Sequence, residues 1–300
     1  MNFLPIQSLA RHTAIYSVGD LLGRSVAIVL LPLYVRRLTQ ADNGIITLSF
    51  AFIGFCAVFY SLGLNQALIR YLSGDREDEA QVRRRFSTVF ITLCVLSSIV
   101  SAVTVLNAAW ISATVLGTEQ NADIIRALAL IVWLDTMSEP LFSLCRARQQ
   151  STRFALTRLV QHTLQILLII YLILVRDAGV RGVFTANIVS STFALIAMLP
   201  VAVGVIRPVF RVGLLREVLG FGLPFVPSAI AVLVISLSDR FLIEHLLGLN
   251  DLGVYGVAYK FSIPVLLLVR AFRSAWAPSV LAVDDPEEAR ALCARVTTYF

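Results

Sequence analysis

The chain has 300 residues, of which 58% are apolar and 15% are charged, whereas a soluble domain normally carries roughly 25% charged residues. Its net charge is +6, from 25 Lys and Arg against 19 Asp and Glu, and the charges gather in short segments between long apolar runs. This distribution excludes a soluble globular domain and a nucleic-acid-binding protein, and it indicates a polytopic membrane protein.

Eight segments are long and apolar enough to cross a bilayer, which takes about 20 mostly apolar residues in a helix. They are residues 13–35, 44–68, 87–111, 123–145, 155–175, 181–205, 218–243 and 252–274. A ninth segment begins near residue 290. We therefore expect an all-α protein with eight complete transmembrane helices and the start of a ninth.

The cysteines and histidines do not form a recognisable site. Cys56, Cys94, Cys145 and Cys293 show no CxxC or Cys–His spacing, and the three histidines are isolated. We expect structural thiols, no metal site and no cofactor.

Arginines are distributed unevenly between the two ends of the predicted helices. One set of connections and adjoining helix ends holds twelve: Arg70, Arg76, Arg83, Arg84, Arg85, Arg146, Arg148, Arg153, Arg158, Arg207, Arg211 and Arg216, with Arg11 before the first helix. The opposite set holds five: Arg36, Arg37, Arg126, Arg176 and Arg181. Positively charged residues stay on the cytoplasmic side, so we expect a multi-pass protein with a cytoplasmic N-terminus.

One passage nearly repeats itself 209 residues later. In this register residues 34–52 align with 243–261, and the identical pairs are Leu38 with Leu247, Asp42 with Asp251, Gly44 with Gly253 and Phe52 with Phe261. The same offset aligns the acidic residues Asp75, Asp78 and Glu79 with Asp284, Glu287 and Glu288. Many transporters are built from two helical repeats. We predict two parallel-repeat lobes around a central cavity, with the first at 1–210 and an incomplete second at 211–300.

Several passages resemble one transporter family. They are LPLYVRRLTQADNGIITLSFAF, GLNQALIRYL, CRARQQSTRFAL and RAFRSAWAPSV, beginning at residues 31, 63, 145 and 270. The chain resembles the polysaccharide transporters, or oligosaccharide flippases, of the multidrug/oligosaccharidyl-lipid/polysaccharide exporter superfamily, with the C-terminal third missing.

This resemblance implies two lobes around a cavity that opens alternately to either side of a bacterial inner membrane. The implied cargo is an undecaprenyl-pyrophosphate-linked oligosaccharide for O-antigen, capsule or exopolysaccharide synthesis. Membrane lipids, a polysaccharide polymerase and a chain-length regulator are the implied partners.

Charged residues inside the predicted spans are the candidate site, because each costs about 2.5–3.5 kcal/mol at a helix centre. Arginine stays protonated and offers a planar fork of donors that suits phosphate oxygens. We expect a cationic set to hold the pyrophosphate or glycan, and an acidic set to pair with those cations or to bind a coupling ion. The cationic set is Arg24, Lys260, Arg270 and, toward the outer end, Arg240; the acidic set is Asp20, Asp135, Glu139 and Asp239.

Other interpretations remain open. These charges could be ion pairs that fix helix packing, and interfacial pairing is favoured for Asp239 and Arg240, near the end of a span. A lipid II flippase and a cation-coupled multidrug antiporter would use the same fold. A membrane glycosyltransferase or polymerase is disfavoured because the outward connections are short and poor in catalytic residues, so we do not expect an enzyme. An inactive truncated product is the last alternative.

Overall fold

The computed structural model describes residues 26–65, 67–68, 79–148, 150–206, 210–266 and 269. The chain divides into two compact units, residues 1–257 and residues 258–300. All regular structure in the described residues is helical, which confirms the all-α prediction. In the second unit, the described residues form the last turn of one helix and a short helical stretch at 263–266.

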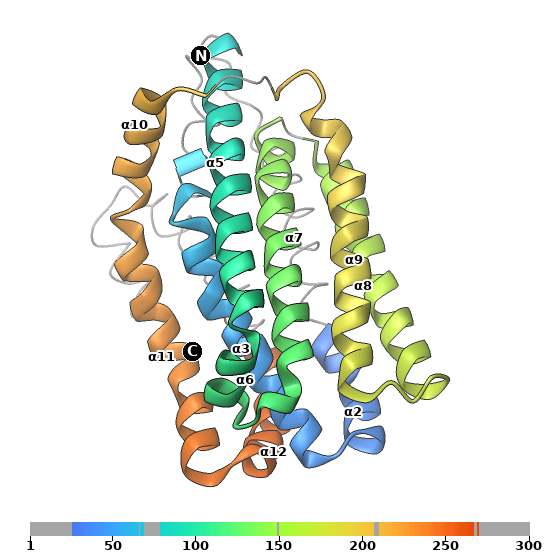
Figure 1. The fold of residues 1–300 in the computed structure, drawn as a ribbon. Helices are drawn as coiled ribbons and strands as arrows, with labels where there is room; N and C mark the ends of the chain where they lie inside the picture. Colours follow the sequence, from blue (N-terminus) through green and yellow to red (C-terminus); the bar gives the residue numbers. More distant parts are fainter. Residues whose placement is uncertain are drawn as a thin grey trace, which may run out of the picture. The chain divides into compact units, whose positions relative to one another are not determined.

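The helices of the described residues are α2 (Leu31–Arg37), α3 (Gln40–Ser61), α5 (Glu79–Leu106), α6 (Ala108–Leu116), the 3-10 helix η1 (Glu119–Asn121), α7 (Ala122–Ala147), α8 (Ser151–Leu174), α9 (Gly179–Ala202), α10 (Val212–Gly222), α11 (Phe225–Leu247) and α12 (Leu249–Lys260). The long helices α3, α5, α7, α8, α9 and α11 alternate in direction, and α10 and α11 follow each other in the same direction (Figure 1). Six helical segments of the described residues are long and apolar enough to cross a membrane. They correspond to the second through seventh predicted spans.

The predicted spans at 87–111 and 218–243 are each divided between two helices in the structure. The segment predicted at 87–111 divides at Asn107 into α5 and α6. The side-chain amide of Asn107 donates to the carbonyl oxygen of Val103 at 2.8 Å, a local hydrogen bond of a kind that competes with helix continuation. The segment predicted at 218–243 divides between α10 and α11 at Pro224, which lacks the N–H that a continuous helix requires.

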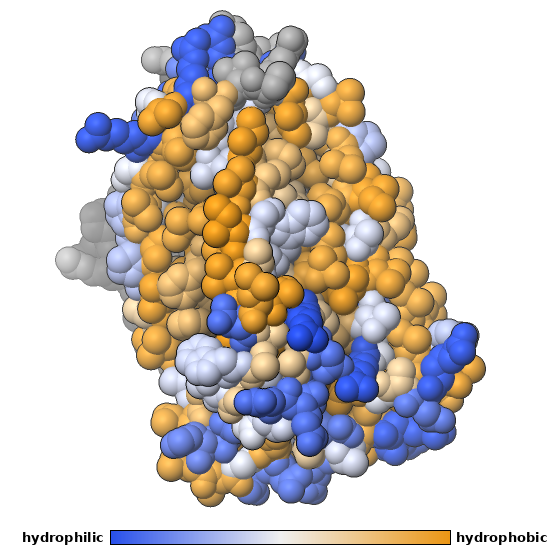
Figure 2. Space-filling model, in the orientation of Figure 1, coloured by the Kyte–Doolittle hydropathy of each residue, from blue (hydrophilic) through white to orange (hydrophobic). Residues whose placement is uncertain are grey.

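Apolar side chains face the surroundings along α5. Val95, Ile99 and Val103 follow one another at four-residue intervals and are all more than half exposed. Figure 2 shows apolar surface over most of the visible middle of the helices, with polar side chains at both ends and most of them at the end that holds α6. Such a surface suits hydrocarbon and not water. The chain is a multi-pass membrane protein.

Helix α7 is the central helix of the first unit, and most of its residues are buried. It packs against α9, α5 and α3. Two apolar clusters support it. The one toward α6 includes Leu116, Ile125 and Leu128, and the one toward α10 includes Phe142 and Phe154. The second cluster borders the guanidinium of Arg158, which lies over the ring of Phe142.

The two copies of the sequence repeat form the same helix break. Helix α3 begins at Gln40, and α12 begins 209 residues later at Leu249. Thr39 caps α3 through reciprocal hydrogen bonds with Asp42. At the matching position Gly248 ends α11 with a φ of +91°, a conformation that favours glycine.

These two helix starts also pack against each other reciprocally. A Cβ atom on Gly44 would overlap the carbonyl oxygen of Leu249, and one on Gly253 would overlap the carbonyl oxygen of Gln40. Both contacts join positions related by the same 209-residue offset. A Cβ on Gly256 would overlap the side chain of Thr47, its own counterpart. The α3–α12 crossing is therefore locally two-fold symmetric and depends on glycine.

Candidate functional site

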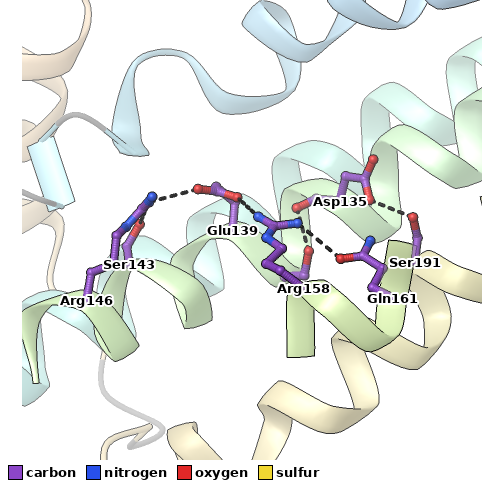
Figure 3. A network of polar contacts seen from close by, with 8 residues as sticks. Asp135, Glu139, Ser143, Arg146, Arg158, Gln161 and Ser191 are labelled. Carbon is purple, nitrogen blue, oxygen red and sulfur yellow. Dashed lines mark hydrogen bonds and ion pairs between the residues drawn. The ribbon is translucent and has the colours of Figure 1, made fainter. Parts of the chain in front are cut away.

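Two carboxylates stand four residues apart on the central helix. Asp135 and Glu139 therefore share one face of α7. Asp135 is exposed, and the side chain of Glu139 is one-third exposed. Polar side chains from α8 and α9 converge on them (Figure 3).

Glu139 bridges two arginines. Nη2 of Arg146, two turns further along α7, donates to Oε1 of Glu139 at 2.9 Å. Nη2 of Arg158, on α8, donates to Oε2 of Glu139 at 3.0 Å. The same Arg146 nitrogen lies 3.2 Å from the hydroxyl of Ser143. Each carboxylate oxygen thus has its own guanidinium partner (Figure 3).

Arg158 is held from several sides. Its guanidinium carbon lies 3.8 Å from the ring centre of Phe142, close enough for a cation–π contact. Nη1 of Arg158 donates to Oε1 of Gln161 at 3.2 Å. Phe142 is itself fixed by an edge-on contact with Phe154, with ring centroids 5.4 Å apart. Among the described residues, Nε of Arg158 is buried without a hydrogen-bond acceptor.

Asp135 has a different partner, on α9. The hydroxyl of Ser191 donates to Oδ1 of Asp135 at 2.7 Å and lies 3.4 Å from Oδ1 of Asn187. A serine hydroxyl has one hydrogen to donate, so the shorter contact with Asp135 takes precedence. Helices α7, α8 and α9 all contribute to one network.

Asp239 and Arg240 form a second polar cluster, on α11. Asp239 accepts hydrogen bonds from Nη1 of Arg240 at 3.2 Å and from the hydroxyl of Tyr255 on α12. Arg240 is only 8% exposed, and its Nη1 also donates to the carbonyl oxygen of Ser236. A phosphate that reached Arg240 would have to compete with these neighbours.

The predicted site residues therefore fall into four groups. Asp135 and Glu139 belong to the first network, and Asp239 and Arg240 to the second. Lys260 is the last residue of α12 and belongs to the second unit. Asp20, Arg24 and Arg270 lie outside the described residues.

Five labelled members of the first network are missing from the predicted site: Ser143, Arg146, Arg158, Gln161 and Ser191 (Figure 3). In the sequence, both arginines are explained by their contribution to the charge difference between the two sides of the membrane. Arg158 lies inside the predicted 155–175 span, which distinguishes it from arginines in the connections. Arg146 lies two turns beyond Glu139, on the same stripe of the helix. Ser191 is a polar residue in a long apolar helix, but such residues are common and give a weak signal.

Comparisons with known proteins agree with this architecture. An outward-facing MATE-family multidrug resistance transporter of the MOP superfamily matches with 15% identity and a TM-score of 0.63, over 87% of this chain and 61% of its own. A MOP-superfamily transporter from Pyrococcus furiosus, described as having a binding pocket of reverse polarity, matches with 15% identity and a TM-score of 0.61. This match covers 87% of this chain and 61% of that transporter. A MATE protein in complex with Br-NRF matches with 17% identity and a TM-score of 0.57, over 87% of this chain and 65% of its own.

This chain therefore spans roughly three fifths of the length of these solved transporters. Its fold is that of the MOP superfamily of membrane transporters. No curated protein matches the chain closely. A family model described as "Polysaccharide biosynthesis protein" matches residues 33–300, and the chain belongs to that family.

Proposed function

We propose that the chain acts in a flippase for lipid-linked oligosaccharides. The cargo is an undecaprenyl-pyrophosphate-linked glycan repeat unit, which moves from the inner to the outer leaflet of a bacterial inner membrane by alternating access. The product serves O-antigen, capsule or exopolysaccharide synthesis. Membership of a polysaccharide biosynthesis family and a MOP transporter fold support this proposal.

The observation that carries the proposal is the arginine pair bridged by Glu139. A pyrophosphate-linked cargo brings negative charge into a medium where an unpaired anion is very costly. Arg146 and Arg158 place two permanent cations inside membrane-spanning helices, with side chains 30% and 18% exposed. Cations in this setting suit a phosphate-bearing cargo.

The same cluster disfavours a cationic drug as cargo. A drug antiporter needs acidic side chains that are available to a cation, but both oxygens of Glu139 are engaged by arginines. Asp135 remains a candidate for the coupling ion, together with Asp20. A lipid II flippase stays the nearest alternative, because lipid II carries the same pyrophosphate linkage. We do not propose enzymatic activity.

The proposal includes the division into a lobe at 1–210 and a second lobe at 211–300, and an orientation with the N-terminus in the cytoplasm. The predicted boundary between residues 210 and 211 falls between the end of α9 at Ala202 and the start of α10 at Val212. An ion pair of 3.1 Å between Arg85 of α5 and Glu217 of α10 joins the two sides of this boundary. The N-terminus and this connection lie in the cytoplasm.

Deletion of the gene, with complementation by the full-length protein, tests the function. The deletion strain should lose surface glycan and accumulate the lipid-linked repeat unit on the cytoplasmic face of the inner membrane. Normal surface glycan in the deletion strain would contradict the proposal. Accumulated peptidoglycan precursor would favour a lipid II flippase, and lost drug resistance with normal glycan would favour an antiporter.

A further inference from the structure

We propose that Arg146 and Arg158 form an anion clamp that takes a phosphate group of the cargo, and that Glu139 occupies the clamp when no cargo is bound. This inference rests on the proposed function and names a binding site for it. Arg146 and Arg158 come from different helices, α7 and α8, and each holds one oxygen of the same carboxylate.

The geometry of the bridge is that of an oxyanion between two guanidinium groups. The two oxygens of Glu139 accept at 2.9 Å and 3.0 Å from separate arginines, distances typical of charge-assisted hydrogen bonds. Two oxygens of a phosphate group can accept from the same two donors. The phosphate adds oxygens that can reach further N–H groups, so it is a stronger ligand than the carboxylate it replaces.

Arg158 is positioned before any cargo arrives. Its guanidinium lies over the Phe142 ring, Gln161 accepts a hydrogen bond from Nη1, and Glu139 accepts one from Nη2. Because the Phe142 ring, Gln161 and the Phe142–Phe154 contact remain when Glu139 leaves, the guanidinium keeps its orientation. Binding then costs little ordering of this side chain.

The depth of the clamp suits the headgroup of a lipid. Glu139 lies eight residues before the end of α7 at Ala147, or about 12 Å along the helix. Arg158 lies seven residues after the start of α8 at Ser151, or about 10 Å. Both therefore lie between the headgroups and the midplane of the bilayer, in the half assigned to the cytoplasm. A lipid-linked phosphate of the inner leaflet reaches this level without crossing the bilayer, which makes the clamp a loading site.

A structural ion pair is the competing explanation, and Glu139 distinguishes the two. In a clamp the carboxylate competes with the phosphate, so removing its charge strengthens phosphate binding. In a purely structural pair the carboxylate only stabilises the arginines, so its removal weakens the fold and leaves binding unchanged. The conservative variant Arg158→Lys keeps the charge and loses the fork of donors.

The test uses the purified full chain in phosphatidylcholine nanodiscs, with farnesyl pyrophosphate as the probe. Glu139→Gln should bind the probe more tightly than wild type. Arg158→Ala should bind about tenfold more weakly or worse, because hydrogen bonds to a charged group are lost, and Arg158→Lys should fall between. The matched control is Arg153→Gln on the same helix, since Arg153 donates to the carbonyl oxygen of Ala197 and not to Glu139. It should bind like wild type.

Competition identifies the source of the phosphate. Inorganic pyrophosphate should displace the probe from wild type, while phosphatidylglycerol vesicles should not. Equal displacement by phosphatidylglycerol would overturn the assignment to cargo in favour of an ordinary membrane lipid. If Glu139→Gln and Arg158→Lys melt as wild type does and also bind the probe as wild type does, the clamp is wrong.

The clamp and the proposed function can fail separately. Normal glycan export in cells that carry Arg158→Ala would overturn the clamp and leave the flippase function standing. Wild-type protein that binds no pyrophosphate, together with a deletion strain whose surface glycan is normal, would overturn both.

Discussion

Asp239 shows how a single carboxylate can join two helices at a membrane-spanning level. It accepts from the guanidinium of Arg240 on its own helix and from the hydroxyl of Tyr255 on α12. A charged acceptor makes such a hydrogen bond roughly twice as strong as a neutral one. The Asp239–Tyr255 contact therefore helps to fix the angle between α11 and α12.

Replacement of Tyr255 tests that contact. Tyr255→Phe removes the hydroxyl and should lower the free energy of unfolding by about 1.5–3 kcal/mol, the range for a hydrogen bond to a charged group. The same change should cost much less when Asp239 is already Asn, because the two residues are coupled. Denaturant titration of the wild type, the two single variants and the double variant gives the coupling.

The control is Tyr171→Phe, at a 45% exposed tyrosine of α8. It should change the free energy of unfolding by less than about 0.5 kcal/mol. Equal effects at both tyrosines would refute the prediction.

Arg24 is predicted from the sequence to hold the phosphate of the cargo. Arg24→Ala should abolish glycan export while the amount of protein in the membrane stays normal, and Arg24→Lys should restore export in part because it keeps charge without the fork. Surface-glycan staining and an immunoblot measure the two quantities. Arg36→Ala, at an exposed arginine of α2, should export normally. Normal surface glycan in the Arg24→Ala strain would contradict the assignment of Arg24 to phosphate binding.

Part of the first network could be predicted from the sequence. Asp135 and Glu139 are noticeable because carboxylates are rare inside apolar helices. Arg158 is not predicted as a site residue, because an arginine near the cytoplasmic end of a span is usually explained by the orientation of the protein in the membrane. Its role depends on Phe142 and Gln161, which approach it only after α7 and α8 have packed. Residue spacing along one helix carries no information about that contact.

At the scale of helices, the α3–α12 crossing brings the two copies of the repeat together. Glycine at 44 and 253 lets the backbone of each helix approach a carbonyl group of the other. Such close approach is a common way for membrane helices to associate, because it increases van der Waals contact where no hydrophobic effect operates. The identity of Gly44 and Gly253 in the repeat thus has a packing cause.

Alanine substitutions test the α3–α12 crossing. Helix propensity alone predicts that they raise stability, whereas close packing at the crossing predicts that they lower it. Alanine is a better helix former than glycine by about 1 kcal/mol, so Gly220→Ala, in open space within α10, should be neutral or slightly stabilising. Gly253→Ala and Gly44→Ala should instead destabilise by about 1–3 kcal/mol, since the added methyl group meets a carbonyl oxygen. Thermal melting of the full chain in detergent compares the three. If all three variants melt alike, the helices do not cross as described.

Helix positions are predicted from the sequence more reliably than helix breaks. Long apolar runs locate α7, α8 and α9 to within a few residues because burial in a bilayer demands both length and composition. The break at Asn107 leaves no gap in apolar character, so the pattern of 87–111 gives no warning of it. Pro224 can explain the break before α11, although apolar residues on both sides of it favour a single span.

At the scale of the whole molecule, the repeat preserves a scaffold and varies its chemistry. Asp239, Arg240 and Tyr255 stand 209 residues after Leu30, Leu31 and Ile46, which are all buried and apolar. A position that supports apolar packing in the first copy therefore carries a charged cluster in the second. This difference makes the second copy a place for polar chemistry, which supports keeping Asp239 and Arg240 among the candidate site residues.

The orientation of the molecule decides whether the proposed clamp can load cargo from the cytoplasm. Twelve arginines favour one side and five the other, and the helices alternate so that the α7–α8 turn and η1 lie at opposite ends of α7 (Figure 1). The exposed residues Gln150 and Gln120 mark these two ends. Because translocation of arginine-rich short connections is disfavoured, the end at Gln150 should face the cytoplasm.

Cysteine labelling of intact cells measures this directly. With the four native cysteines replaced by alanine, Gln120→Cys should react with a membrane-impermeant maleimide, and Gln150→Cys should react only after the cells are permeabilised. Both variants need wild-type membrane levels and wild-type glycan export, so that the labelled protein is the working one. The reverse labelling pattern would place Arg146 and Arg158 at the outer leaflet. The pair would then meet the cargo after its transfer, and a loading role in the cytoplasmic half would be impossible.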